Sequence, residues 1–313
     1  MSEVKKVATR ESYGNALKEL GAENPNVLVL DADLAGATKT GVFKKAYPDR
    51  FFDCGIAEGN MVGIAAGLAT TGKIPFCSTF AMFAAGRAFE QVRNSVGYPH
   101  LNVKIAATHA GISVGEDGAT HQCNEDIALM RTIPGMVVLN PADDVEARAA
   151  VKAAAEYEGP VYLRFGRLAV PVFNDEANYK FEIGKGILLR EGTDLTIVAP
   201  RLCVNSALEA AEKLAAEGIS AEVINIHTIK PLDEEIILKS AKKTGKVVTA
   251  EEHSVIGGLG SAVCDVLSEK LPTPVKKIGV YDVFGESGPA VKLLEKYKLD
   301  GAGVYEQIKD WLK

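Results

Sequence analysis

The 313-residue chain is poor in aromatic residues, which make up 7% of it and include a single tryptophan, Trp311. It also lacks an excess of basic residues, since 35 Lys and Arg stand against 41 Asp and Glu and give a net charge of −6. A nucleic-acid-binding protein normally carries a strongly basic surface. The composition therefore excludes that class of partner, and an anionic ligand would have to be met by a local cluster of basic side chains.

Long apolar runs and paired cysteines are missing as well. No stretch approaches the ~18 residues of a transmembrane helix, and the N-terminus has no apolar region of the length that a secretory signal requires. The odd number of cysteines is scattered and never spaced as C-x-x-C: Cys54, Cys77, Cys123, Cys203 and Cys264. This pattern predicts reduced thiols in a cytoplasmic protein without membrane contact, and no disulfide framework or zinc site.

The sequence does contain a regular alternation of short apolar runs and helical stretches. Strands are predicted at 27–31, 75–80, 103–108, 136–140, 161–165, 194–199, 221–226, 246–250 and 276–280. Nearly continuous apolar strands are typical of parallel sheets that are buried on both faces. The predicted fold class is α/β, with two consecutive three-layer domains whose sheets are mainly parallel.

A segment without periodicity, 168–186, separates the two sets of strands. We predict a first domain over 1–170, a linker over 171–186 and a second domain over 187–313. Helices are predicted over 143–156, 205–217 and 233–244. The first of these begins with Asp143 and Glu146 in the spacing of a capping box.

One candidate site begins at Glu58, ahead of a predicted helix that is apolar nearly all round and is therefore expected to be buried. Gly59, Gly63 and Gly67 share one face of this helix, which would let another helix approach closely, either from this chain or from a second subunit. Two interpretations of Glu58 stay open. It is either a carboxylate favoured by the helix dipole or a proton donor that apolar surroundings allow to work near neutral pH.

A second candidate site is the glycine-rich loop after the strand 103–108. It holds His109, Glu116, Asp117 and His121, and ligands of parallel sheets bind at the carboxyl ends of strands. The alternative is a polar surface loop. The spacing of these residues matches no zinc signature, so no metal site is predicted in this chain.

Further candidates come from aromatic, basic and glycine-rich positions. Phe80 and Phe83 either stack on a planar heterocycle or belong to the core. Arg10, Arg164 and Arg167 either hold a phosphate or carboxylate or are solvated surface residues. The turn 257–261, after Glu251-Glu-His253, either binds an anion at a helix N-terminus or allows close packing. A Gly-Asp-Gly motif followed by a distant Asn, as in sites for magnesium and diphosphate, is missing.

Three motifs in this order resemble the transketolase family: Gly55-Ile-Ala-Glu58-Gly-Asn-Met61, Ser78-Thr-Phe80-Ala-Met-Phe83, and His109 followed by Gly115-Glu-Asp117-Gly-Ala-Thr-His121-Gln122. The resemblance extends over essentially the whole chain and includes 226–233, Glu251-Glu-His253 and 284–289 in its second half. It matches the pyrimidine-binding and C-terminal domains of that family. The family's first domain, which carries the metal and diphosphate motif, is missing, so the chain resembles the C-terminal subunit of a split transketolase.

The resemblance implies a role for each site residue. Glu58 falls on the family glutamate that binds the aminopyrimidine ring of thiamine diphosphate and promotes its imino tautomer, and Phe80 and Phe83 match the aromatic pocket for that ring. Some members have a third aromatic residue where this chain has Gly86. His121 matches a residue near the cofactor and the transferred unit, with a catalytic role beside Glu58.

Substrate residues follow from the same resemblance. Asp117 matches the residue that binds a hydroxyl of the donor sugar, and His121 lies near the same sugar. Arg10, His109 and Arg167 match residues that hold the sugar phosphate. The chain departs from the family at Asp31, where a serine near the phosphate is expected and a carboxylate would repel it.

The implied reaction is the reversible transfer of a two-carbon ketol unit between ketose and aldose phosphates in the pentose phosphate pathway. The implied partners are an N-terminal subunit, which would bind Mg or Ca and share thiamine diphosphate with this chain, and a second copy of this chain in a heterotetramer. The chain alone is expected to be inactive. The alternatives are half of a deoxyxylulose-phosphate synthase, half of a 2-oxoacid dehydrogenase, or a non-catalytic paralogue kept as a regulatory or assembly module.

Overall fold

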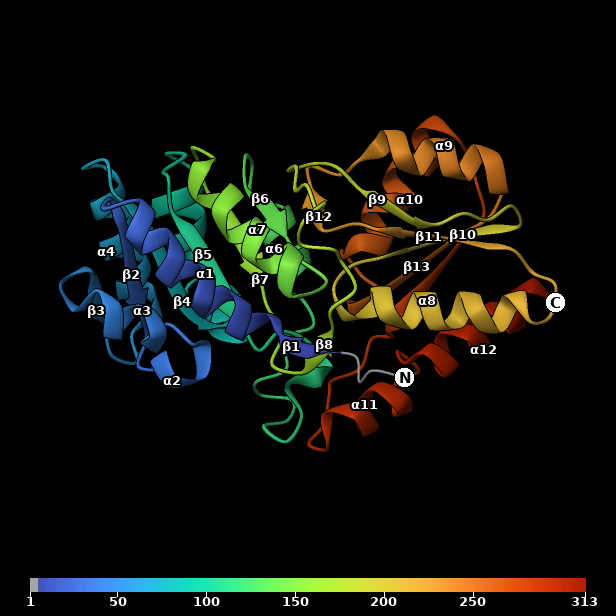
Figure 1. Ribbon diagram of the computed structural model, residues 1–313, viewed down its shortest axis with the longest axis horizontal. Helices are drawn as coiled ribbons and strands as arrows, with labels where there is room; N and C mark the ends of the chain where they lie inside the picture. Colours follow the sequence, from blue (N-terminus) through green and yellow to red (C-terminus); the bar gives the residue numbers. More distant parts are fainter. Residues whose placement is uncertain (1–4) are drawn as a thin grey trace.

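The computed structural model describes residues 5–313, and it shows two α/β units side by side (Figure 1). The first unit is built on a seven-stranded sheet of order β12-β6-β7-β5-β4-β2-β3. Its strands are β2 (Val27–Asp31), β3 (Phe51–Asp53), β4 (Ile74–Phe80), β5 (Lys104–Thr108), β6 (Val137–Leu139), β7 (Val161–Arg164) and β12 (Thr228–Lys230). All neighbours pair in parallel except β12, which is antiparallel to β6.

The second unit is built on a five-stranded sheet of order β14-β13-β10-β11-β9. Its strands are β9 (Ile187–Arg190), β10 (Leu195–Ala199), β11 (Ala221–Asn225), β13 (Val247–Ser254) and β14 (Val275–Val280). Only β9 runs antiparallel to its neighbour. Each strand predicted from the apolar runs is present, and the predicted α/β class with mainly parallel sheets is confirmed.

Helices cover both faces of each sheet and so produce the three layers. In the first unit, α1 (Thr9–Glu23), α3 (Gly41–Ala46) and α7 (Asp144–Glu156) pack on one face, and α4 (Glu58–Ala69), α5 (Phe89–Gln91) and α6 (Asp126–Arg131) on the other. In the second, α8 (Leu202–Ala215), α11 (Ala290–Lys296) and α12 (Gly301–Leu312) lie opposite α9 (Glu234–Thr244) and α10 (Leu259–Lys270). None of the helices within residues 5–313 has the length and apolarity needed to cross a membrane.

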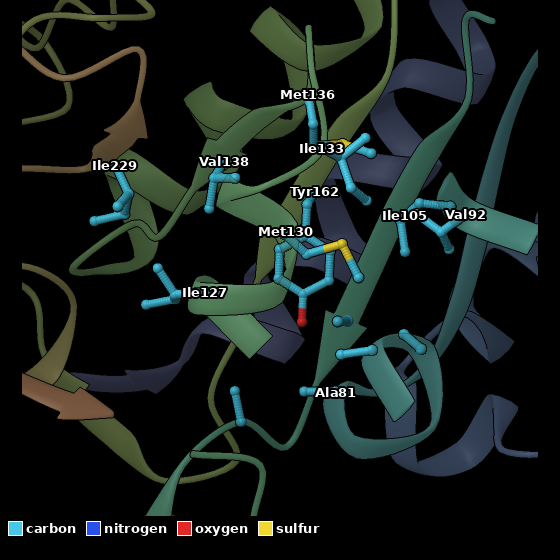
Figure 2. Packing of buried hydrophobic residues seen from close by; sticks show 14 of the residues in the cluster. Ala81, Val92, Ile105, Ile127, Met130, Ile133, Met136, Val138, Tyr162 and Ile229 are labelled. Atoms are coloured by element: carbon cyan, nitrogen blue, oxygen red, sulfur yellow. The ribbon is translucent and has the colours of Figure 1, made fainter. Parts of the chain in front are cut away.

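A single apolar cluster continues from the first unit into the second. Figure 2 shows Met130 and Tyr162 at the centre of its first-unit part, with Ile229 of β12 beside Val138 of β6. The same cluster includes Ile224 of the second sheet. The two units therefore share a contiguous core rather than meeting only at their surfaces.

Several strands of three or four residues were not predicted. Among them, β1 (Lys6–Ala8) pairs antiparallel with β8 (Ala169–Pro171), which begins inside the non-periodic segment 168–186. Three residues are too short to display an alternation of apolar and polar positions. These strands therefore depend on the partners that the fold brings to them.

One half of the predicted capping box at the start of α7 is present, and the Glu146 carboxylate also connects the two units. Asp143 accepts a hydrogen bond from the backbone N–H of Glu146 at 3.0 Å. The Glu146 carboxylate accepts from the Ala142 N–H, from the Tyr179 hydroxyl and from the Asn225 amide. Burial raises the pKa of Glu146 to about 7. This one carboxylate thus holds together α7, the segment 171–186 and β11.

Candidate active site

The candidate site lies at the carboxyl ends of neighbouring parallel strands of the first sheet. Phe80 is the last residue of β4 and His109 follows β5, while Arg167 comes shortly after β7. Arg10 stands in the first turn of α1, and its backbone N–H donates to Gly166 O at 3.3 Å. The parallel pairing of β4, β5 and β7 brings these positions to one edge of the sheet, where ligands of α/β proteins bind.

Glu58 is buried at the N-terminus of α4, with 4% of it exposed. Arg87 Nη1 donates to Glu58 Oε1 at 3.3 Å, and the same guanidinium lies 4.1 Å from the centre of the Phe83 ring. A flat cation is thus hydrogen-bonded to Glu58 and stacked on Phe83 at once. Gly86, beside Arg87, is exposed, and a Cβ there would meet Met82.

The rings of Phe80, Phe83, His109 and His121 lie against one another and connect the surroundings of Glu58 with the glycine-rich loop. Phe80 stacks on Phe83 with centroids 5.8 Å apart and on His109 at 3.9 Å. The ring of His121 meets Phe83 edge-on at 5.3 Å and Phe80 at 6.2 Å. The predicted aromatic residues and both histidines of the loop therefore form one cluster.

The hydrogen bonds of His109 define its protonation state. Arg10 Nη1 lies 3.0 Å from His109 Nε2, and a guanidinium can only donate, so Nε2 accepts. The proton therefore resides on Nδ1, which donates to Thr108 Oγ1 at 2.9 Å. Burial, together with the charges of Arg10 and Arg167, lowers the pKa of His109 to about 3. His109 is a neutral hydrogen-bonding group in this site.

We expect the His109 imidazole to stay neutral on acidification of the folded protein, because its pKa lies well below the ordinary value of about 6.5. As the pH falls, His109 of the unfolded chain binds a proton before His109 of the folded protein does. The free energy of unfolding therefore decreases as the pH falls from about 6.5 towards 3. The slope is at most about 1.4 kcal/mol per pH unit. Nitrogen NMR checks the tautomer, and His109→Gln should flatten the pH dependence of unfolding. Titration of His109 between pH 6 and 7 in the folded protein would contradict the prediction.

Arg167 and its acidic neighbours form the outer wall of the site. Arg167 Nη1 donates to Val114 O at 2.5 Å and lies 3.4 Å from Glu116 Oε2 and 3.8 Å from Asp117 Oδ2. Arg10, Glu116 and Arg167 line an open pocket of about 350 Å³, to which 289–291 of the second unit also contribute. Two arginines therefore line this pocket, and the Glu116 side chain is exposed.

Two candidates have structural roles that the sequence did not indicate. Arg164 is buried and bonded to Asp126, so it is neither a solvated residue nor a ligand for phosphate. Asp31 is fully buried and accepts hydrogen bonds from Leu34 N–H and from the hydroxyls of Thr38 and Thr40. Burial raises the pKa of Asp31. Its carboxylate organises the loop after β2.

The glycine-rich turn 257–261 accepts an anion from within the chain. Glu251 takes hydrogen bonds from the backbone N–H groups of Leu259 and Gly260, at 2.7 and 2.8 Å, in the first turn of α10. A side chain at Gly258 would collide with this carboxylate. The turn therefore serves close packing around an internal anion.

Within residues 5–313, α4 is buried on one side only, so the predicted burial on all sides would need a second subunit. Met61, Val62, Ala65 and Ala66 pack on the sheet, but Gly63, Ile64 and Gly67 face solvent. Ile56, just before the helix, is 74% exposed and Ile64 is 41% exposed. The helix forms the outer layer of its unit, so its second apolar face has no cover within residues 5–313.

Arg87 is the site residue that the sequence analysis missed. Its one signal was its position four residues after Phe83, which places both on one face of a helical turn. The segment Phe83–Arg87 forms a π-helical turn, and that spacing brings the guanidinium over the ring.

Comparisons with known proteins identify the family. The model of the transketolase pyrimidine-binding domain matches residues 5–172, and that of the transketolase C-terminal domain matches residues 184–304. The chain is 54% identical over 306 residues to a Methanocaldococcus jannaschii protein named as a transketolase C-terminal section, covering 97% of this chain and 96% of that one. It is 48% identical over 291 residues to a 6-deoxy-6-sulfo-D-fructose transketolase subunit of a Clostridium species, covering 93% and 90%.

A solved structure is similar over the same extent. It is described as a split-gene transketolase in the form of an inactive β4 tetramer, and it matches with a TM-score of 0.89, 57% identity and 98% coverage of both chains. Two covered, mainly parallel sheets, with an acidic, aromatic and basic site at the strand ends of the first, are those of a transferase of the transketolase family, to which this chain belongs. Within the family it is a C-terminal subunit of the split-gene type.

Proposed function

We propose that this subunit transfers a two-carbon ketol unit between ketose and aldose phosphates, as in the pentose phosphate pathway, and does so in the cytoplasm with an N-terminal partner subunit. The observation that supports this most is the continuity of the ring cluster. It joins Glu58 and Phe83, which Arg87 bridges, to His109 and Arg10. The proposed sites for a planar cofactor and for an anionic sugar would thus lie side by side.

The residues present fit the aminopyrimidine of thiamine diphosphate. The Arg87 guanidinium lies on Phe83 while bonded to Glu58, and these are the two contacts that a flat, nitrogen-rich ring would make. The Arg87 side chain is 54% exposed and can leave. Glu58, Phe80 and Phe83 would hold the ring, and the partner subunit would bind the diphosphate with Mg or Ca.

Thiamine diphosphate, when bound, supplies the electron sink for carbon–carbon bond cleavage. This chain would supply the remaining functions. Glu58 holds and returns a proton at its carboxylate, and His121 and Asp117 orient hydroxyl groups of the sugar. Arg10, Arg167 and neutral His109 bind the anionic end, for which paired guanidinium groups are well suited.

A transketolase assay tests the proposal. The chain is mixed with an N-terminal transketolase subunit, thiamine diphosphate and magnesium, and supplied with xylulose 5-phosphate and ribose 5-phosphate. We expect products from the mixture and none from either chain alone. Product from pyruvate and glyceraldehyde 3-phosphate instead would favour the synthase alternative, and activity only in 2-oxoacid decarboxylation would favour the dehydrogenase one.

The exposed face of α4 is our candidate surface for self-association, because Ile56, Ile64 and the glycines form an apolar patch next to Glu58. We expect Ile64→Asp to shift the protein from an oligomer to a monomer in analytical ultracentrifugation. Leu188→Asp is the matched control, since Leu188 on β9 is 40% exposed against 41% for Ile64. An oligomer that survives Ile64→Asp, or one that Leu188→Asp disrupts equally, would place the interface elsewhere.

A further inference from the structure

Two buried side chains of the second unit, Arg201 and Glu252, reach beneath the loop that carries His109 and Asp117. Arg201 is 3% exposed and Glu252 2% exposed, and the two form an ion pair. Removing charges from water is unfavourable unless both also gain good hydrogen bonds. The remaining contacts of the pair therefore show which part of the protein it holds.

Glu252 holds the backbone of the loop. Its Oε1 accepts a hydrogen bond from the Ser113 N–H at 2.5 Å. Gly111, at a φ of +83°, lies so close that a Cβ there would be 2.6 Å from the Glu252 carboxyl group. Both contacts fall between His109 and Asp117, so Glu252 fixes the path of the chain between two substrate residues.

Arg201 lies beneath the point where the anion-binding residues converge. Its Nη2 donates to the carbonyl of Ala110, next to His109, at 3.3 Å. Its guanidinium also packs on Gly166, where any side chain would collide with it, and Gly166 precedes Arg167. The carbonyl of Gly166 in turn accepts from the backbone of Arg10. One side chain thus supports the backbone beside all three residues.

The backbone of Arg201 is itself in a strained conformation. Its φ is +49°, in the left-handed region that a residue with a side chain rarely adopts. Such strain persists where the surrounding contacts over-determine it. The ion pair with Glu252 and the bond to Ala110 are contacts of this kind.

We propose that Arg201 and Glu252 are positioning residues that set the spacing of Arg10, His109 and Arg167 and thereby the preference of the site for an anionic sugar. The proposal rests on the proposed function for the identity of the ligand. Displacements of about 1 Å in a binding site are enough to weaken it strongly. Arg201 and Glu252 then act in substrate selection without touching the substrate themselves.

Glu252→Gln and Arg201→Lys in the full chain, reconstituted with the N-terminal subunit, test this. We expect kcat/KM for ribose 5-phosphate to fall about tenfold through KM, whereas kcat/KM for ribose stays within about twofold. Binding of inorganic phosphate, measured by calorimetry, should weaken by the same factor. Hydrogen exchange at the Ser113 amide should accelerate about tenfold in Glu252→Gln.

Glu222→Gln is the matched control. Glu222 is also a buried glutamate of the second unit, but its partners Lys243 and Thr196 belong to that unit. Equal losses for ribose and ribose 5-phosphate, or unchanged phosphate binding, would overturn the proposal. Absence of ketol transfer in the wild type would overturn only the proposed function. The role of Arg201 and Glu252 would still be decided by the binding of phosphate. If Glu252→Gln fails to fold, Arg201→Lys carries the same comparison.

Discussion

Replacing Glu58 by glutamine should lower ketol transfer by the reconstituted enzyme by about 10²–10⁴-fold, which is the range that a positioned acid or base contributes. Glutamine has nearly the same shape and can still bond Arg87 or a pyrimidine nitrogen. It cannot take up or return a proton at the carboxylate. The variant should therefore bind its partner subunit and unfold in urea much as the wild type does.

Glu90→Gln is the control for this experiment. Glu90 lies in α5 and is exposed, with side-chain bonds to Gln91 and Asn94. Its replacement should leave the rate unchanged within about twofold, because surface substitutions away from special features have small effects. A Glu58→Gln enzyme that retains a third or more of the wild-type rate would exclude Glu58 as the proton-transfer group. If Glu58→Ala changes no phenotype at all, the result would favour the alternative that the protein is a non-catalytic paralogue.

The largest loss of stability is expected from Asp126→Ala. Asp126 and Arg164 are buried at 0% and 1% exposure, with Arg164 Nε 2.8 Å from Asp126 Oδ2. Burial alone would raise the pKa of Asp126, but Arg164 and the Tyr162 hydroxyl offset this and leave it below the ordinary value. Without the carboxylate, the Arg164 cation stays buried and uncompensated. The free energy of unfolding should fall by about 3–5 kcal/mol.

Urea denaturation measures this loss, and Asp265→Ala is its control. Asp265 is 75% exposed and lies 3.5 Å from Arg131, so its removal should cost about 1 kcal/mol or less. The double variant Asp126→Ala, Arg164→Met should recover part of the stability, because the unpaired charge is gone. If Asp126→Ala is as mild as Asp265→Ala, water must reach the Arg164 guanidinium.

The long strands could be predicted from the sequence because nearly continuous apolar runs of this length are typical of strands buried on both faces. The predicted strand 221–226 and the observed β11 differ by one residue, for example, whereas β13 continues past the predicted end at 250 to Ser254. That extension carries Glu251 and Glu252, whose charges argue against a buried strand. Glu251 is bonded to the nearby first turn of α10, but Ser113, the partner of Glu252, is distant in sequence, so only the fold shows how Glu252 is accommodated.

The candidate site also has a part that could be predicted from the sequence and a part that could not. The glycine-rich loop and the two phenylalanines stood out by type and spacing, and the structure places their side chains in contact. The structural roles of Arg164 and Asp31 could not be predicted, for one physical reason. A charged residue is expected at the surface unless it is paired, and neither Asp126 nor the hydroxyls of Thr38 and Thr40 could be assigned as partners beforehand.

The antiparallel strand β12 has a consequence for the order in which the protein folds. The first sheet takes this edge strand from residues 228–230, although the other six end by Arg164. During synthesis, the edge of β6 that faces β12 therefore has unpaired N–H and C=O groups until residues 228–230 of the second unit have been made. A free edge of this kind can pair with another nascent chain. A fragment ending near residue 170 would keep the free edge of β6. The two domains are therefore best expressed and engineered together as one polypeptide.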